Sequence, residues 1–371
     1  MAPMISTTSL LLFLASFCVV TASPVPLLIS RDTTYDFTSS INASLPNVTI
    51  FATGGTIASQ GTTNTQTVGY SIGLGVQQLV DAVPELLNIS NINGYQISNV
   101  ASGSVNSSIL LTLASSITEE LSKPEIAGVV VTHGTDSLEE TAFFLDLVIN
   151  SSKPVILAGA MRPATALSAD GPLNLYQAIR LASSANARNR GALITLNDRI
   201  GSAFYTTKNN ANSLDTFYST EAGQLGFFIN QVPYFYFAPA RPMGQPYFDV
   251  SNLTSLPQID ILYAHQDMDA QLTSLAVAGG AEGLVFAGMG AGGLSGVAST
   301  AAEAVFNATS IPMVASHRSA DGFVPPATDD DMISSGFYNP QKARVLLQLA
   351  VAKGYGLVEI GDVFASSYPS A

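Results

Sequence analysis

Short apolar runs recur along the chain from Asn47 onward, and segments with helical spacing of apolar positions separate them. The runs are continuous rather than alternating, which is typical of strands buried on both faces of a sheet. We predict strands at Val48–Ala52, Ala127–Thr132, Pro154–Ala158 and Ala192–Leu196. We predict helices at Leu111–Leu121, Ser137–Ile149 and Asn174–Ser184. Because strands and helices alternate, the pattern indicates a parallel sheet with right-handed crossovers.

A segment rich in Pro, Tyr, Phe and Gly, Val232–Tyr247, interrupts this rhythm, which then resumes on a smaller scale. The later strands are expected at Ile259–Tyr263, Gly283–Phe286 and Pro312–Val314. The fold class is therefore α/β, with a larger N-terminal domain whose mainly parallel sheet is flanked by helices and a smaller C-terminal α/β domain. We expect the N-terminal domain at residues 45–240, a linker at 241–256 and the C-terminal domain at 257–371.

The beginning of the chain is typical of a secretory leader. No charged side chain precedes Arg31, and Leu10–Val20 is an apolar run too short to span a membrane. We interpret residues 1–22 as a signal peptide and residues 23–44 as a processed or loosely ordered leader. Seven N-x-S/T motifs would suit a secreted or cell-wall glycoprotein; they begin at Asn42, Asn47, Asn88, Asn106, Asn150, Asn252 and Asn307.

Composition excludes several classes of function. The 371 residues include 14 Lys and Arg against 27 Asp and Glu, a formal charge of −13, so nucleic acid is a poor partner. Three His and one Cys cannot supply the usual Cys/His zinc site, and we expect no metal and no cofactor. After the leader, no apolar stretch is long enough for a membrane helix.

The first candidate site is Thr53-Gly54-Gly55-Thr56, directly after the first expected strand. Two glycines allow a tight turn and close approach of a ligand, and they present Thr56 beside backbone N–H groups. This arrangement suits a hydroxyl nucleophile with an oxyanion hole, although a plain βα turn would also explain it. Tyr70 follows a polar stretch, Ser59–Gly69, that is a candidate lid.

The second candidate is His133-Gly134-Thr135-Asp136, at a strand-to-helix junction. Thr135 beside the carboxylate of Asp136 can hold a water or an amine. His133 is either a base or a packed residue at a strand end, and Ser137 with Glu140 has the spacing of a capping box. Asp136 and Glu139 share that spacing.

Two further motifs have competing interpretations. Lys208 lies in a polar segment after the strand Ala192–Leu196 and is either a surface lysine or a base that loses its proton in a pocket. Gly288, Gly290 and Gly293 form a G-x-G-x-x-G after a strand, but the acid expected at the end of the next strand is not evident. A nicotinamide oxidoreductase therefore remains an alternative.

Together these motifs resemble one family, the bacterial-type (type II) L-asparaginases. The resemblance is carried by Leu45–Ser59 (LPNVTIFATGGTIAS), Val129–Leu147 (VVVTHGTDSLEETAFFLDL), Gly159–Ile179 and Asn339–Ala350 (NPQKARVLLQLA). With the leader and the N-x-S/T motifs, it indicates a secreted eukaryotic, fungal member. It implies hydrolysis of L-asparagine to L-aspartate and ammonia and a homotetramer with sites between subunits.

The resemblance also assigns roles by position. It makes Thr56 the nucleophile that forms an acyl-enzyme and Tyr70 the lid tyrosine. The second threonine, the aspartate and the lysine correspond to Thr135, Asp136 and Lys208, and the general base is either Tyr70 or this trio. Substrate would be bound by Ser102, Gly103, Thr135, Asp136 and the backbone of Ala160.

The chain departs from the family at three places. Gly103 stands where the family often has Gln, the C-terminal glycine loop lacks Asn, and the intersubunit glutamate has no clear counterpart beyond Asp321 or Asp329. These departures leave two further alternatives open: a glutaminase-asparaginase of broad specificity, and a secreted amino-acid-binding protein that has lost turnover.

Overall fold

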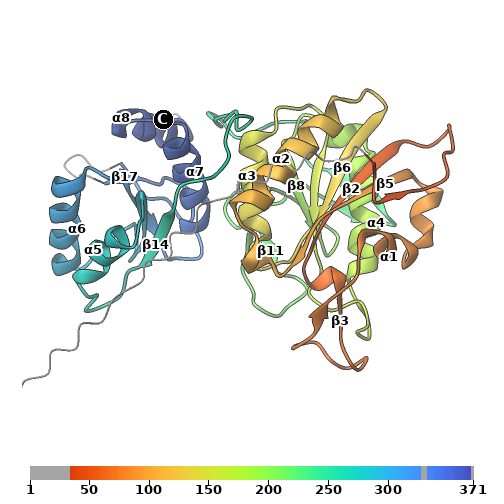
Figure 1. Ribbon diagram of the computed structural model, residues 1–371, viewed down its shortest axis with the longest axis horizontal. Coiled ribbons are helices and arrows are strands. Elements are labelled where there is room, and N and C mark those ends of the chain that lie inside the picture. Colours follow the sequence, from red (N-terminus) through yellow and green to blue (C-terminus); the bar gives the residue numbers. More distant parts are fainter. Residues whose placement is uncertain (1–33, 327–331, 369–371) are drawn as a thin grey trace, which may run out of the picture. The chain divides into compact units, whose positions relative to one another are not determined.

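A computed structural model describes residues 34–326 and 332–368, and the residues from Tyr35 onward belong to one compact unit. Figure 1 shows two sheets, each packed against helices. The expected signal peptide, residues 1–22, and Asp329 lie outside the described residues.

The larger sheet has nine strands in the order β1-β5-β2-β6-β7-β8-β9-β12-β13. The five strands β5, β2, β6, β7 and β8 are parallel, and antiparallel strands complete both edges. In chain order the strands are β1 Phe37–Thr38, β2 Asn47–Gly54, β5 Asn91–Val100, β6 Ile126–Thr132, β7 Val155–Ala158, β8 Ala192–Leu196, β9 Arg199–Ser202, β12 Gly226–Ile229 and β13 Val232–Phe235.

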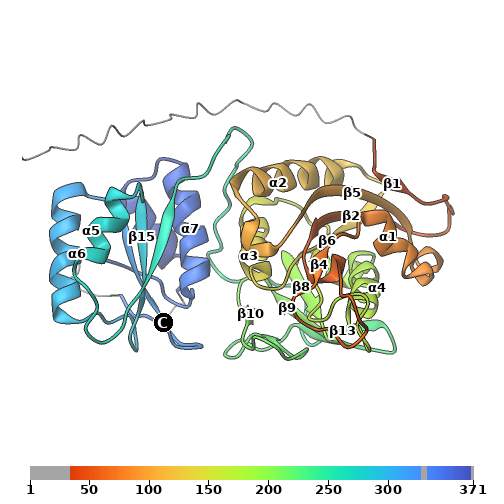
Figure 2. The ribbon, with the colours of Figure 1, turned by 60° about the horizontal axis from the view of Figure 1, so that its bottom comes forward.

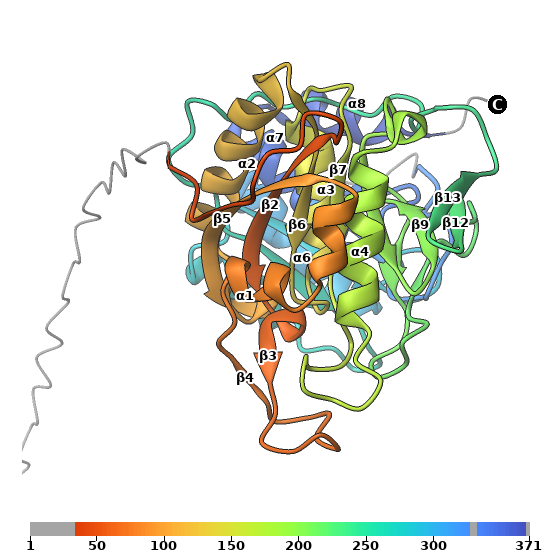
Figure 3. The same ribbon diagram turned by 90° about the vertical axis from the view of Figure 1, so that its right-hand side faces the viewer.

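Helices cover both faces of this sheet (Figure 3). The helices are α1 Val76–Asp81, α2 Ser107–Ser122, α3 Leu138–Val148 and α4 Gly171–Ala182. Strand β2 shows why two layers form: Val48, Ile50 and Ala52 pack in the core with α1 and α4, whereas Phe51 packs in the core with α2 and α3. Continuous, largely apolar strands of this kind bury both of their faces.

The smaller sheet is parallel, with the order β14-β15-β16-β17. Figure 2 shows α5 and α6 on one side of it and α7 on the other. Its elements are β14 Ile259–Tyr263, α5 Gln271–Ala278, β15 Gly283–Gly288, α6 Gly296–Thr309, β16 Met313–His317, β17 Ile333–Ser334, α7 Pro340–Ala352 and α8 Leu357–Ala365. Asn339 caps α7 by accepting from the N–H of Lys342 at 3.0 Å, and Pro340 occupies the first turn, where a missing N–H costs nothing.

Short elements complete the fold. Strands β3 and β4 form a hairpin after β2, and β10 and β11 form a separate two-stranded sheet. The four strands are β3 Ser59–Gln60, β4 Ser71–Ile72, β10 Thr207–Lys208 and β11 Phe217–Tyr218. The 3₁₀ turns are Thr56–Ala58, Pro84–Asn88, Ser102–Ser104 and Ala185–Ala187.

The predicted fold class is confirmed: a large, mainly parallel sheet flanked by helices and a smaller α/β domain. Two local expectations need correction. Packed structure begins before Leu45, because β1 pairs with β5 and the Tyr35 hydroxyl donates to the buried Glu120 carboxylate at 2.9 Å. Val232–Phe235, taken as part of the break between domains, is edge strand β13; Pro233 is tolerated there because an edge strand has unpaired positions.

Candidate functional site

Four neighbouring strands bring the candidate residues to one edge of the large sheet. In the order β5, β2, β6 and β7, the segments just after these strands carry Ser102, Thr56, Thr135 with Asp136, and Ala160. The carboxyl ends of parallel strands lie at the same sheet edge, where α/β proteins bind ligands. The sequence residues named separately above are therefore neighbours in the fold.

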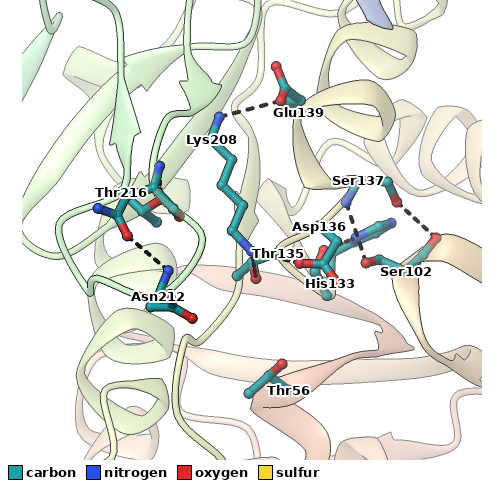
Figure 4. A network of polar contacts seen from close by, with 12 residues as sticks. Thr56, Ser102, His133, Thr135, Asp136, Ser137, Glu139, Lys208, Asn212 and Thr216 are labelled. Atoms are coloured by element: carbon teal, nitrogen blue, oxygen red, sulfur yellow. Dashed lines mark hydrogen bonds and ion pairs between the residues drawn. The ribbon is translucent and has the colours of Figure 1, made fainter. Parts of the chain in front are cut away.

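Gly55 and Gly134 allow the two central loops to touch. A Cβ on Gly55 would lie 2.2 Å from the Cα of Gly134, and Gly55 has φ = 80°, which L side chains rarely adopt. Only residues without a side chain permit this approach of backbone to backbone. The contact draws Thr56, next to Gly55, toward Thr135, next to Gly134 (Figure 4).

Thr56 and Tyr70 are paired. Their hydroxyl oxygens lie 2.9 Å apart, and Tyr70 reaches Thr56 from the end of the β3–β4 hairpin. The tip of the hairpin is held by Gln66, which accepts from the N–H of Thr62 at 2.6 Å and donates to the carbonyls of Val68 and Gly69. This segment is the one interpreted from sequence as a lid.

Lys208 joins Thr135 and Asp136. Its ammonium donates to the Thr135 hydroxyl at 3.0 Å and forms an ion pair with Asp136 at 2.6 Å. The side chain of Lys208 is 12% exposed and that of Asp136 is 84% exposed. The lysine is therefore partly desolvated, while the carboxylate remains open to a ligand from solution.

Ser102 and Gly103 border the site on the β5 side. Ser102 is buried, its hydroxyl accepts from the N–H of Ser137 at 3.4 Å, and its carbonyl accepts from the Ser137 hydroxyl at 2.8 Å. Gly103 is exposed, and no described atom lies within 4 Å of the position that a Cβ would take there. Residue 103 thus faces open space beside a fixed serine.

Ala160 lies in a loop that two polar residues at the start of α4 organise: Asp170, just before the helix, and Asn174, in its first turn. Asp170 accepts from the N–H groups of Met161 and Arg162, each at 2.9 Å, and Asn174 donates to the carbonyl of Gly159 at 3.0 Å. Ala160 itself is fully buried. The backbone beside the site is therefore held from both sides, a role for Asp170 and Asn174 that the sequence analysis missed.

His133 is not an open base. It is fully buried, with Nδ1 2.8 Å from the carbonyl of Gly134 and Nε2 2.9 Å from the hydroxyl of Thr141. Burial lowers the pKa of His133 to about 4, so the ring is neutral near pH 7. Of the two interpretations, the packed strand-end residue is the one that the geometry favours.

The capping box expected at Ser137 and Glu140 is wrong. Ser137 does precede α3, but its hydroxyl donates to the carbonyl of Ser102, and Glu140 pairs with Arg344 at 3.1 Å. Glu139 turns toward β10 and accepts from the hydroxyl of Thr207. The side chains of Ser137 and Glu140 therefore bind partners elsewhere in the fold instead of capping α3.

The glycine loop of the smaller domain closes on itself. Met289 and Gly293 exchange backbone hydrogen bonds of 2.7 and 2.8 Å, and α6 begins only at Gly296, capped by Ser295. Two N–H groups of the loop are thus used inside the turn, and the glycine loop does not lead directly into a helix N-terminus as a dinucleotide phosphate site requires, so the geometry does not favour the nicotinamide alternative. Asp321, a candidate for the intersubunit acid, accepts from the N–H of Glu221 in the same chain at 3.0 Å.

Metal and membrane features were searched in the part of the chain that the structure describes. There, no three His, Cys, Asp or Glu side chains gather as metal ligands. Within the same residues, none of the helices combines the length and apolar character that crossing a bilayer requires.

Family models cover both domains of the chain. Residues 47–240 match the model described as "Asparaginase, N-terminal", and residues 258–364 match "Glutaminase/Asparaginase C-terminal domain". The chain is 50% identical to L-asparaginase 2-3 of Saccharomyces cerevisiae over 365 residues, covering 97% of this chain and 99% of that protein. It is 45% identical to L-asparaginase 2 of Bacillus subtilis over 313 residues, covering 83% of each.

A solved structure agrees with these matches. It is the crystal structure of a probable cytoplasmic L-asparaginase from Campylobacter jejuni, which is 38% identical in sequence with a TM-score of 0.83. The match covers 86% of this chain and 99% of that chain.

The same structure contradicts the expectation of secretion or cell-wall location. The solved relative is titled as cytoplasmic, and the residues interpreted as a signal peptide lie outside those described. The expectation of secretion is therefore not supported.

Proposed function

The chain belongs to the asparaginase family and hydrolyses L-asparagine to L-aspartate and ammonia, and we propose that Thr56 is the nucleophile of this reaction. In the first step the Thr56 hydroxyl oxygen bonds to the side-chain amide carbon of asparagine. The carbon–nitrogen bond then breaks, ammonia leaves with the proton from the hydroxyl, and an ester joins Thr56 to the aspartyl group. Water hydrolyses this ester, releases aspartate and restores the hydroxyl.

The observation that carries this proposal is the 2.9 Å contact between the hydroxyls of Thr56 and Tyr70. A free threonine hydroxyl is a very weak nucleophile near neutral pH, so a group must take its proton. Tyr70 lies within hydrogen-bonding distance of that proton. We assign the first proton transfer to Tyr70.

The Thr135–Lys208–Asp136 group then acts on the second step. The Lys208 ammonium donates to the Thr135 hydroxyl at 3.0 Å, so this contact orients Thr135 rather than taking its proton. A lysine donating to a hydroxyl holds that hydroxyl in one orientation, from which Thr135 directs the water that attacks the ester. The two threonine loops meet at Gly55 and Gly134, which supports their sharing one reaction.

Substrate recognition is assigned to the remaining residues. The exposed carboxylate of Asp136 suits the α-ammonium of asparagine as a charge-assisted bond. Ser102 and Gly103 suit the α-carboxylate, and the backbone N–H groups of Thr56 and Ala160 form the oxyanion hole. The roles come from the family resemblance, and the arrangement of four neighbouring strand ends supports them.

Assembly is proposed to be a homotetramer, with each site between two subunits. The support is the family resemblance; Asp321, one candidate for the acid contributed across the subunit interface, accepts from the N–H of Glu221 in its own chain. Gly103 stands where the family often has Gln, so the ammonia assay compares turnover of asparagine with turnover of glutamine.

Ammonia release tests the proposal directly. Purified protein is given asparagine or glutamine, and Thr56→Ala and Thr56→Ser are assayed in parallel. We expect release from asparagine, retained in part by the serine variant and reduced by more than about 10³-fold in the alanine variant, because alanine has no hydroxyl with which to form the acyl-enzyme, while the backbone N–H of residue 56 stays in place. Full turnover in Thr56→Ala would overturn the assignment.

The assay also separates the alternatives. Equal turnover of both amides would identify a glutaminase-asparaginase. Absence of release, with asparagine still raising the melting temperature, would identify a binding protein without turnover.

A further inference from the structure

Lys208 is carried by a weakly supported element. It lies in β10, which pairs with β11 as a separate two-stranded sheet rather than as part of the nine-stranded sheet. Isolated two-stranded ladders are marginally stable in water. The position of the Lys208 ammonium must therefore be fixed by contacts from outside β10.

One such contact comes from Glu139, in the first turn of α3. Its carboxylate accepts from the Thr207 hydroxyl and from the backbone N–H of Lys208 at 3.4 Å (Figure 4). Glu139 is buried and follows Asp136 by one turn of chain. The same short segment thus holds Lys208 at its backbone through Glu139 and at its ammonium through Asp136.

The other contacts come from the start of α7, in the smaller domain. Asn339 donates to the Glu139 carboxylate and to the Thr207 hydroxyl, each at 3.1 Å. Lys342 is 2% exposed, and its ammonium donates to the carbonyls of Phe204 and Thr206 at 2.8 and 2.7 Å. These carbonyls belong to the turn that leads into β10.

Burying the ammonium of Lys342 costs free energy, and its hydrogen bonds to the two carbonyls must offset that cost. Burial lowers the pKa of Lys342 to about 8, against the opposing effect of the negative charges of Glu139, Asp146 and Asp321. Two buried carbonyls would lose their donor if Lys342 were removed, so the turn would shift to find new partners.

We propose that Lys342, Asn339 and Glu139 are positioning residues for the reaction, and that the C-terminal helix α7 thereby sets where Lys208 lies relative to Thr135 and Asp136. This inference rests on the proposed function, because it gives Lys208 a task to be positioned for. A displacement of about 1 Å in a reacting group can cost about 10²-fold in rate. Lys208 itself is assigned to the second step rather than to substrate binding, so its displacement should change turnover more than KM.

The first test is Lys342→Met, which keeps an unbranched side chain of similar length without the charge. We expect kcat to fall about 10- to 100-fold with KM for asparagine changed less than about threefold. Lys353→Met is the matched control: Lys353 closes the same helix and also donates to a backbone carbonyl, that of Asp249 at 3.0 Å, but on the exposed side. It should keep the kcat of the wild type.

A second variant guards against a Lys342→Met protein that does not fold. Asn339→Ser replaces the capping amide oxygen by a capping hydroxyl but is too short to reach Glu139, so helix capping and positioning are separated. We expect a lower kcat at nearly unchanged melting temperature. Wild-type kcat in Asn339→Ser would overturn the proposal, whatever happens to Lys342→Met.

A double-mutant cycle identifies the residue through which the effect acts. In a Lys208→Met background, Lys342→Met should lower kcat no further, because the group being positioned is already gone. Losses that multiply would mean that Lys342 acts on stability or elsewhere in the site, and they would overturn the proposal. A separate result, full turnover in Thr56→Ala, would overturn the proposed function itself rather than the positioning role of Lys342.

Discussion

Gly55 and Gly134 meet backbone to backbone, and this contact joins the two threonine loops of the site. A Cβ on Gly55 would lie 2.2 Å from the Cα of Gly134, at a φ of 80°. The two glycines therefore set the distance between Thr56, the proposed nucleophile, and Thr135, which is proposed to act on the second step.

Gly55→Ala is expected to abolish activity and destabilise the fold. The substitution combines an unfavourable φ with a backbone overlap, which together cost about 3 kcal/mol or more in the free energy of unfolding. Urea unfolding and ammonia release measure the two effects. Gly73→Ala is the control, because among the described residues nothing lies within 4 Å of its Cβ position. Equal behaviour of the two variants would contradict the close approach.

Tyr70→Phe tests which group takes the first proton. The change removes the hydroxyl 2.9 Å from Thr56 and keeps the ring, so kcat should fall by about 10²- to 10⁴-fold with little loss of stability. Tyr234→Phe, at a residue that is 49% exposed, should leave kcat unchanged. If Tyr70→Phe retained most of its turnover, the base would instead belong to the group containing Lys208.

Gly103→Gln should tighten the binding of asparagine. The space at Gly103 is open to a side chain, and the resembling family often has glutamine there. One added hydrogen bond to the α-carboxylate is worth about 0.5–1.5 kcal/mol, so KM should fall about two- to tenfold. Gly103→Ala adds bulk without the amide and should not lower KM. A lower KM in both variants would show that the amide is not responsible.

Buried His133 should make stability depend on acid pH. Its pKa falls from 6.5 to about 4 on folding, so the unfolded chain binds the proton first as the pH drops. The stability that His133 contributes is present above pH 6.5 and is lost progressively down to about pH 4, by up to about 3 kcal/mol. Asp146 has the opposite effect on stability. Burial raises its pKa to about 6, so the folded protein binds this proton more tightly than the unfolded chain, and the contribution of Asp146 is lost as the pH rises toward 6.

The His133 contribution is isolated by comparing variants rather than by the wild-type curve alone. His133→Asn has no group that titrates in this range, so its stability deficit relative to the wild type should shrink between pH 7 and pH 4.5. A deficit that stays constant with pH would mean that folding does not lower the pKa of His133.

The parts of the fold that could be predicted from sequence are those where local pattern and burial agree. The strand Ala192–Leu196 is β8 residue for residue, since it is apolar on both faces and flanked by polar turns. Strand β5 was not expected because Asn91–Val100 (NINGYQISNV) mixes polar and small residues. Gly94 in that strand is required by packing, as a Cβ there would lie 2.6 Å from Val76.

The site residues also divide into those that a local sequence pattern indicates and those that only distant contacts bring into place. Thr56, Thr135 and Asp136 follow strand ends, where sequence analysis can find them. Tyr70 and Lys208 were assigned through family resemblance, because the contacts that bring them in come from a hairpin and a two-residue strand. Lys342 could not be found at all: in the sequence it is one polar position of an amphipathic helix, and only its contact with Phe204 and Thr206 shows that it is buried.

We propose that Thr56 carries the aspartyl group during turnover, and rapid-quench mass spectrometry can trap and detect this acyl-enzyme. Enzyme mixed with excess asparagine is quenched in acid within the first turnover, digested and searched for a peptide heavier by one aspartyl group. We expect this adduct in the peptide that contains Thr56, with fragmentation placing it on Thr56 itself. We expect no adduct in Thr56→Ala. An adduct on Thr135, or ammonia release by Thr56→Ala at the wild-type rate, would contradict it.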